Sequence, residues 1–155
     1  MHYRLLTVLL FINLSLFAQT KKPLSHDVYD SWKSLGERQI SNDGNNIVYS
    51  INEQEGDGDL FVRNIKTGYQ KIIRRGYAAV ITEDSRYVIC KIKPVYQETR
   101  QAKIKKKKAD EMVKDSLAYI QLGLDSVIKI SRVKSFKTPE KGSGLLAYHL
   151  EKPLP

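Results

Sequence analysis

A nine-residue pattern occurs twice in this chain and limits its fold more than any other feature of the sequence. Ser41–Tyr49 aligns without gaps with Thr82–Cys90, at an offset of 41 residues. In each copy a hydroxyl residue is followed two positions later by an aspartate, then by a small residue and an apolar run. A repeat of about 40 to 50 residues is typical of proteins built from successive copies of one supersecondary unit.

From Ile40 on, short runs rich in Val, Ile, Tyr and Phe alternate with turn residues. Such runs are typical of β-strands. Tight turns are expected at Asp43–Gly44, Lys66–Gly68 and Leu122–Asp125, since each contains a residue that tolerates positive φ. The sequence therefore predicts an all-β fold, either a sandwich or barrel or a β-propeller. The expected strands are Asn46–Ile51, Leu60–Ile65, Tyr69–Ile73, Ala78–Ile81, Tyr87–Ile92, Leu117–Leu122, Ser126–Ile130 and Leu145–Leu150.

The repeat favours a β-propeller of antiparallel four-stranded blades, because blades repeat in sequence and sandwich strands generally do not. We expect the aspartate turn to carry the chain from the outer strand of one blade to the inner strand of the next. A third, weaker copy of the pattern, Phe136–Gly144, leads into the last apolar run.

Counting blades predicts about two and a half of them. One spans Ile40–Arg74, a second spans Gly76–Arg132 and a third begins before Pro155, with a basic insert at about 94–116 inside the second. Closing a propeller takes at least about four blades. We therefore expect 40–155 to be an incomplete β-propeller at the front of a longer protein, with a strand at Leu145–Leu150 whose free edge invites pairing.

The first residues have the features of a signal peptide. Arg4 precedes a mainly apolar run, Leu5–Phe17, which ends at the small residue Ala18. A membrane anchor is the alternative, but a span needs about 20 apolar residues and this run is shorter and interrupted by polar ones. We expect residues 1–18 to be removed between Ala18 and Gln19, with export to the periplasm or the extracellular space and no membrane association afterwards.

Residues 19–39 are expected to form an irregular lead-in to the propeller. Ser25 or Asp27 is placed to cap a short helical turn, which Gly36 and mixed polarity keep from extending. Tyr29, Trp32 and Leu35 are spaced three residues apart, and Trp32 is expected to anchor this segment by packing rather than to bind a ligand.

Much of the positive charge is confined to one cluster. The chain has 155 residues and a formal net charge of +9, and six basic residues lie between Arg100 and Lys108 with no acid among them. Such a cluster can neutralise phosphates, but it lacks interleaved aromatic residues, and acidic residues follow it directly. We interpret it as an exposed excursion and expect no nucleic-acid partner.

The chemically reactive residues do not form a catalytic or metal-binding pattern. Ser143 lacks the outer glycines of the G-x-S-x-G motif of serine hydrolases. His26 and His149 are interpreted as a turn residue and a strand residue, and Cys90 as a small core residue. The acidic stretch Glu55–Asp59 departs from the EF-hand calcium pattern. We predict no catalytic, cofactor-binding or metal-binding residue, and a single cysteine excludes an intrachain disulfide.

The chain resembles the N-terminal region of secreted prolyl-oligopeptidase-family serine peptidases of Bacteroidetes type. The resemblance rests on KKPLSHDVYDSWKSLGERQISNDG, NEQEGDGDL, TEDSRYVICKIKP, TRQAKIKKKKADEMVKDSL and VKSFKTPEKGSGLLAYHLEKP, within Lys21–Gly44, Asn52–Leu60, Thr82–Pro94, Thr99–Leu117 and Val133–Pro153. In that family a β-propeller precedes an α/β-hydrolase domain.

The resemblance implies that this segment is itself non-catalytic. It would filter access to a serine peptidase site and help position peptide substrates, while a C-terminal hydrolase domain, absent from this sequence, cleaves the peptide. The alternative is a stand-alone periplasmic binding or assembly module that obtains its remaining blades from a partner chain.

Overall fold

The computed structural model describes residues 26–142 and 144–152, whose strands form three antiparallel sheets. The first contains β1 (Lys33–Ile40), β2 (Asn46–Glu53), β3 (Asp59–Asn64) and β4 (Gln70–Arg74), in that order. The second contains β5 (Gly76–Ile81), β6 (Tyr87–Ile92), β7 (Ser116–Gln121) and β8 (Val127–Ser131), in that order. The third pairs β9 (Val133–Lys137) with β10 (Ala147–Leu150). The predicted all-β character is confirmed.

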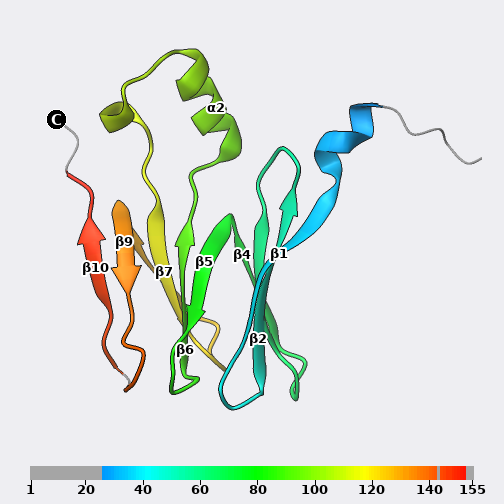
Figure 1. Cartoon of the computed structure of the whole chain (residues 1–155), viewed down its shortest axis with the longest axis vertical. Helices are drawn as coiled ribbons and strands as arrows, with labels where there is room; N and C mark the ends of the chain where they lie inside the picture. Colours follow the sequence, from blue (N-terminus) through cyan, green and yellow to red (C-terminus); the bar gives the residue numbers. More distant parts are fainter. Residues whose placement is uncertain (1–25, 143, 153–155) are drawn as a thin grey trace, which may run out of the picture.

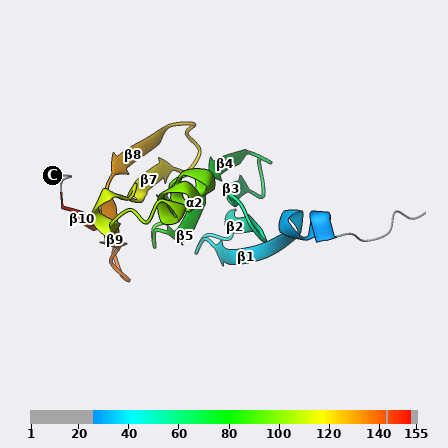
Figure 2. The ribbon, with the colours of Figure 1, turned by 90° about the horizontal axis from the view of Figure 1, so that it is seen from above.

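The three sheets follow one another along the molecule in chain order, as Figures 1 and 2 show. The second sheet lies between the other two and buries side chains from both of its faces. Val88 and Cys90 of β6 face the first sheet and share a core with Leu60 of β3, whereas Leu117 of β7 packs on the opposite face against Val133 of β9. Each fully buried aliphatic side chain contributes about 1.5–3 kcal/mol to folding. The buried side chains on the two faces of the second sheet therefore hold the three sheets together.

The lead-in is more regular than its sequence predicts. It contains a 3-10 helix, η1 (His26–Ser31), and then β1, so the expectation of an irregular segment over 19–39 is wrong from Lys33 onward. Gly36 lies within β1 beside Ser50 and Asn52, where an added Cβ would lie 2.4 Å from the Ser50 hydroxyl. The strand was missed because it is largely exposed and has no apolar alternation, and its pairing with β2 is what makes it a strand.

The two copies of the repeat form the same turn. Ser41 Oγ donates to Asp43 Oδ1 at 2.5 Å and accepts from Asn46 N at 2.9 Å. Thr82 Oγ1 likewise donates to Asp84 Oδ1 at 2.6 Å and accepts from Tyr87 N at 3.0 Å. The predicted role of the aspartate in closing the turn is therefore confirmed.

The expected position of this turn between sheets is wrong. It joins β1 to β2 and β5 to β6, each time within one sheet. The reason is β1, which adds a strand before the first turn. The chain instead passes between sheets at Arg75 and Arg132, single residues with φ of 61° and 62° that follow β4 and β8. Gly76 then begins β5 against Leu60, where an added Cβ would lie only 2.7 Å from the Leu60 Cβ.

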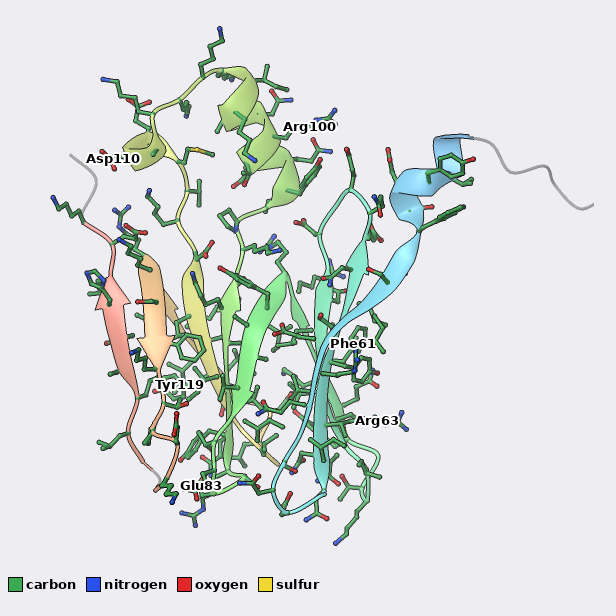
Figure 3. The ribbon with its side chains drawn as sticks, in the orientation of Figure 1. Phe61, Arg63, Glu83, Arg100, Asp110 and Tyr119 are labelled. Atoms are coloured by element: carbon green, nitrogen blue, oxygen red, sulfur yellow. The ribbon has the colours of Figure 1, made fainter. Side chains whose placement is uncertain are left out.

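The basic stretch is an excursion between β6 and β7. It holds α2 (Tyr96–Ile104) and a short 3-10 helix, η2 (Ala109–Glu111), and neither has a buried residue. In Figure 1 it extends beyond the strands at one end of the sheets, and Figure 3 places Arg100 and Asp110 there, at the opposite end from Glu83. The interpretation as an exposed insert is confirmed. The β2–β3 loop of the first sheet lies at the same end.

Candidate binding site beside the insert

Most of the predicted candidate residues are placed by the structure, and they do not converge. The signal segment 1–18 and Ser143 lie outside the described residues. His26 begins η1, and His149 lies exposed on β10 opposite Ser135, with no hydrogen bond between these two side chains. Cys90 is fully buried, and desolvation raises the pKa of its thiol to about 12, so it is a core residue as predicted.

Trp32 packs against a neighbouring ring but remains half exposed. Its ring meets Tyr29 edge-on with centroids 4.8 Å apart, as the packing interpretation predicts, yet 53% of the residue is exposed and Leu35 is exposed as well. The backbone carbonyl of Trp32 accepts a hydrogen bond from Gln54 N at 3.0 Å, which ties the lead-in to the β2–β3 loop.

The acidic stretch forms this loop, and its carboxylates are used to hold the insert. Asp57 Oδ1 accepts from Tyr96 N at 2.9 Å, and Glu55 Oε2 accepts from the Tyr96 hydroxyl at 3.1 Å. Within the described residues no three His, Cys, Asp or Glu side chains come together as a metal site would require. The loop is thus an anchor for the first residue of α2.

A groove of about 500 Å³ lies between the acidic loop and the start of the insert. One side comes from the end of β2 and the β2–β3 loop, and the other from the β4–β5 junction, the end of β6 and the first turn of α2. Its charged lining residues are Glu53, Asp57, Asp115, Arg75 and Lys93. The groove therefore brings together charges of both signs from several elements.

A hydrogen-bonded cluster supports the floor of this groove. Asp115, just before β7, accepts from the Tyr77 hydroxyl and forms an ion pair with Lys91 at 2.7 Å. Burial raises the pKa of Tyr77, and its hydrogen bond to the Asp115 carboxylate raises it further. Burial acts to lower the pKa of Lys91, but the hydrogen bonds to Asp115 and Tyr77 outweigh it and raise that pKa. Lys91 also donates to the Lys134 carbonyl at 2.9 Å, which links the second sheet to the third.

Arg75, at the junction between β4 and β5, lines the groove. Its N–H donates to the Gly58 carbonyl at 2.7 Å, and its own carbonyl accepts from Lys93 N at 3.0 Å, so the backbone is held from both sheets. Its Nε is shielded from solvent and has no hydrogen-bond partner among the described residues. Lys93 Nζ lies 5.0 Å from the centroid of the Tyr77 ring.

Comparisons with protein-family models, with curated proteins and with solved structures find no match to this chain. The resemblance to prolyl-oligopeptidase-family peptidases is therefore an expectation from the sequence stretches quoted above. No helix in the described part of the chain is long and apolar enough to cross a membrane.

Sequence reasoning missed every cation and aromatic side chain of the groove. Arg75, Tyr77 and Lys93 occur in ordinary strand-end sequence, and nothing in their spacing marks them. The one available signal was the position of Arg75 and Arg132, each at the boundary between two predicted blades.

Proposed function

We propose that the described sheets are successive blades of a β-propeller, and that this propeller is the substrate-gating and positioning segment of an exported prolyl-oligopeptidase-like serine peptidase. One observation supports the propeller most: a four-stranded antiparallel sheet is formed twice with the same strand order. Each copy carries the same aspartate turn and is followed by an arginine junction with positive φ. Stacking of such sheets through their faces is how propellers are built.

The contacts between the first two sheets have a constant spacing, which supports the same proposal. Glu37 Oε2 accepts from Ala79 N at 3.1 Å and Gln39 Oε1 accepts from Ile81 N at 2.8 Å, each across 42 residues. Asn42 donates to the Glu83 carbonyl at 3.0 Å across 41 residues. This spacing is expected when each residue of one repeat lies beside the equivalent residue of the next repeat.

The outer face of the first sheet carries apolar side chains, which favours the presence of further blades. Tyr49 and Phe61 stack there with centroids 5.1 Å apart and planes within 5° of parallel, and Ile72 beside Phe61 is 47% exposed. Figure 3 places Phe61 and Arg63 on the side of the molecule away from the second sheet. In a closed ring this apolar face would pack against the last blade.

The peptidase part of the proposal is tested on the protein that the native gene produces. An antibody against this chain recovers the cellular product, whose mass is measured and which is treated with a fluorophosphonate that labels activated serines. A product several times heavier than 17.8 kDa that becomes labelled supports the peptidase. A stable, unlabelled product of about that mass overturns it and favours the stand-alone binding or assembly module.

Export is tested separately on the same material. The proposal expects the protein outside the cytoplasm with Gln19 as its first residue, because the signal segment is removed after Ala18. Fractionation and N-terminal sequencing measure this. An uncleaved protein in the cytoplasm would contradict it.

A further inference from the structure

Two cations face the groove beside the insert without an anionic partner. Neither Arg75 nor Lys93 forms a side-chain hydrogen bond or ion pair within residues 26–142 and 144–152. Surface cations are often solvated in this way, but the Nε of Arg75 is shielded from water. A shielded N–H without an acceptor is unfavourable. The other N–H groups of the guanidinium also lack an acceptor among the described residues, and these are the ones that an anion in the groove can bind.

Both cations are held in place. The Arg75 backbone is hydrogen-bonded on each side to a different sheet, and Lys93 follows the end of β6 with its ammonium group over the Tyr77 ring. That ring is itself fixed by the bond from its hydroxyl to Asp115. Guanidinium and ammonium groups positioned in this way form charge-assisted hydrogen bonds with a carboxylate.

The carboxylates that line the groove do not neutralise these cations. Asp115 is occupied by Tyr77 and Lys91, and Asp57 accepts from Tyr96 N. Glu53 lies 3.9 Å from Lys33 on the exposed side of the sheet. Glu53 and Asp57 come from the end of β2 and the acidic loop, whereas the two cations follow β4 and β6, so a ligand in the groove meets acceptors as well as cations.

The charge distribution restricts the class of ligand. A ligand with several negative charges would be repelled by Glu53 and Asp57. A single carboxylate attached to N–H donors satisfies both kinds of group, with the carboxylate at Arg75 and Lys93 and the donors at the carboxylates of the acidic loop. The end of a peptide chain has this chemistry.

We propose that the groove bounded by Arg75, Lys93 and the acidic loop binds the C-terminal carboxylate of a peptide. The corresponding junction beside the third sheet also has a shielded arginine Nε without a partner, at Arg132, but it differs in two respects. There, Arg132 donates to the Lys152 carbonyl, and Glu151 rather than a lysine donates its N–H to the junction carbonyl. The binding site is therefore specific to the first junction. This site does not depend on the peptidase proposal.

The experiment titrates the full chain with N-acetyl-triglycine, which carries a free C-terminal carboxylate. Binding is measured by calorimetry and by the chemical shifts of the Arg75, Gly76 and Lys93 amides. Saturable shifts at these amides are expected, and none with the C-terminal amide of the same peptide. N-acetyl-glutamate amide provides a side-chain carboxylate in place of a chain end, and stronger binding to it than to the free chain end would overturn the assignment to a C-terminus.

Variants separate the site from general effects on folding. Lys93→Gln removes one charge without changing the junction backbone and should weaken binding about tenfold or more. Arg75→Asn should abolish binding, since asparagine tolerates the positive φ while removing the guanidinium. Arg132→Asn makes the same change at the other junction and should leave the affinity unchanged. Equal loss in both junction variants, unaltered binding by Lys93→Gln, or equal shifts with inorganic phosphate would each overturn the proposal.

Discussion

Asp43 is exposed and Asp84 is half-buried, and each closes its copy of the repeated turn by accepting hydrogen bonds from residues of that turn. The hydroxyl of Ser41 donates to Asp43 and that of Thr82 to Asp84, and backbone N–H groups of Asn45 and Arg86 donate to the same carboxylates. These bonds, the side-chain ones foremost, lower the pKa of both aspartates. The charged forms therefore favour the folded state.

The first prediction concerns acid stability. A lowered folded-state pKa gives stability that is complete above the unfolded value, about 3.9, and is lost as the pH falls through the lowered value. The free energy of unfolding should therefore decrease below about pH 4. Asp43→Asn with Asp84→Asn should reduce this slope, measured by urea unfolding between pH 2 and pH 5.

The slope should not vanish in the double variant. Asp125, at the β7–β8 turn, also has a lowered pKa because Lys71 of β4 donates to it and attracts its charge. Asp110→Asn, in the exposed η2, is the matched control and should leave the slope as in the parent chain. An identical slope in the parent and the double variant would contradict the role of the turn carboxylates.

At the scale of elements, β1 illustrates how one sheet caps the edge of the next. Its Glu37 and Gln39 side chains accept hydrogen bonds from N–H groups of β5, the strand that opens the second sheet. A strand at a sheet edge presents unpaired backbone groups that must be satisfied by other means. Here two side chains from an otherwise exposed strand provide the acceptors.

The second prediction removes one of these acceptors. Gln39→Ala leaves the N–H of Ile81, a buried residue, without its partner. The expected loss is about 1 kcal/mol of unfolding free energy, measured by chemical denaturation. Arg38→Ala, at the neighbouring position in β1, has no such bond among the described residues and should change stability by less than about 0.5 kcal/mol. Equal effects would contradict the edge-capping role of Gln39.

The insert behaves as an appendage of its sheet rather than as part of the core. Neither α2 nor η2 has a buried residue, and no ion pair within the described residues involves the basic cluster Arg100–Lys108. The equivalent connection in the first sheet is the short β2–β3 loop, which shows that the sheet itself needs no helix there.

The third prediction is therefore that the insert can be removed. Replacing residues 95–113 by a short Gly-Ser linker should lower the unfolding free energy by less than about 1 kcal/mol. The side-chain hydrogen bonds to the rest of the chain that are lost, those of Tyr96 and that of Lys114 Nζ to the Ala109 carbonyl, are exposed. Thermal unfolding followed by circular dichroism measures this. Asp115 is retained in the variant because it supports Lys91 and Tyr77. Loss of the cooperative transition would show that the insert contributes to the core.

For the molecule as a whole, the two terminal faces differ from the stacked interior. The second sheet is covered on both sides, whereas β10 is exposed along its whole length, with Tyr148 at 45% and Leu150 at 52%. A groove lined by Tyr119, Ile130 and Leu145 lies between the second sheet and the third, and Figure 3 places Tyr119 on that side of the second sheet. An exposed apolar edge strand is a site of intermolecular pairing.

The fourth prediction follows for the 155-residue chain. It should associate as its concentration rises, and Tyr148→Lys with Leu150→Lys should reduce association because charge on an edge strand disfavours pairing. Sedimentation velocity measures both. Val113→Lys, at a still more exposed apolar position in the insert, is the control and should have no effect. A parent chain that remains monomeric at high concentration would contradict the prediction.

Local sequence determined much of this protein. The apolar runs, the aspartate turns and the exposed insert were all predictable, because strand alternation and turn chemistry depend on residues within a few positions of one another. The same information placed Cys90 in a core strand and located the boundaries between sheets near Arg75 and Arg132.

Only the tertiary structure decided the rest. The Lys33–Ile40 segment is a strand because β2 pairs with it and N–H groups of β5 donate to its side chains, and neither contact has a local signature. The groove exists because Arg75, Lys93 and the acidic loop are brought together from three connections. Tyr96 and Lys91 occupy the carboxylates of Asp57 and Asp115. Arg75 and Lys93 are left without an anionic partner among the described residues. Such pairings span about 40 residues, and they arise from the stacking of two sheets rather than from any pattern along the chain.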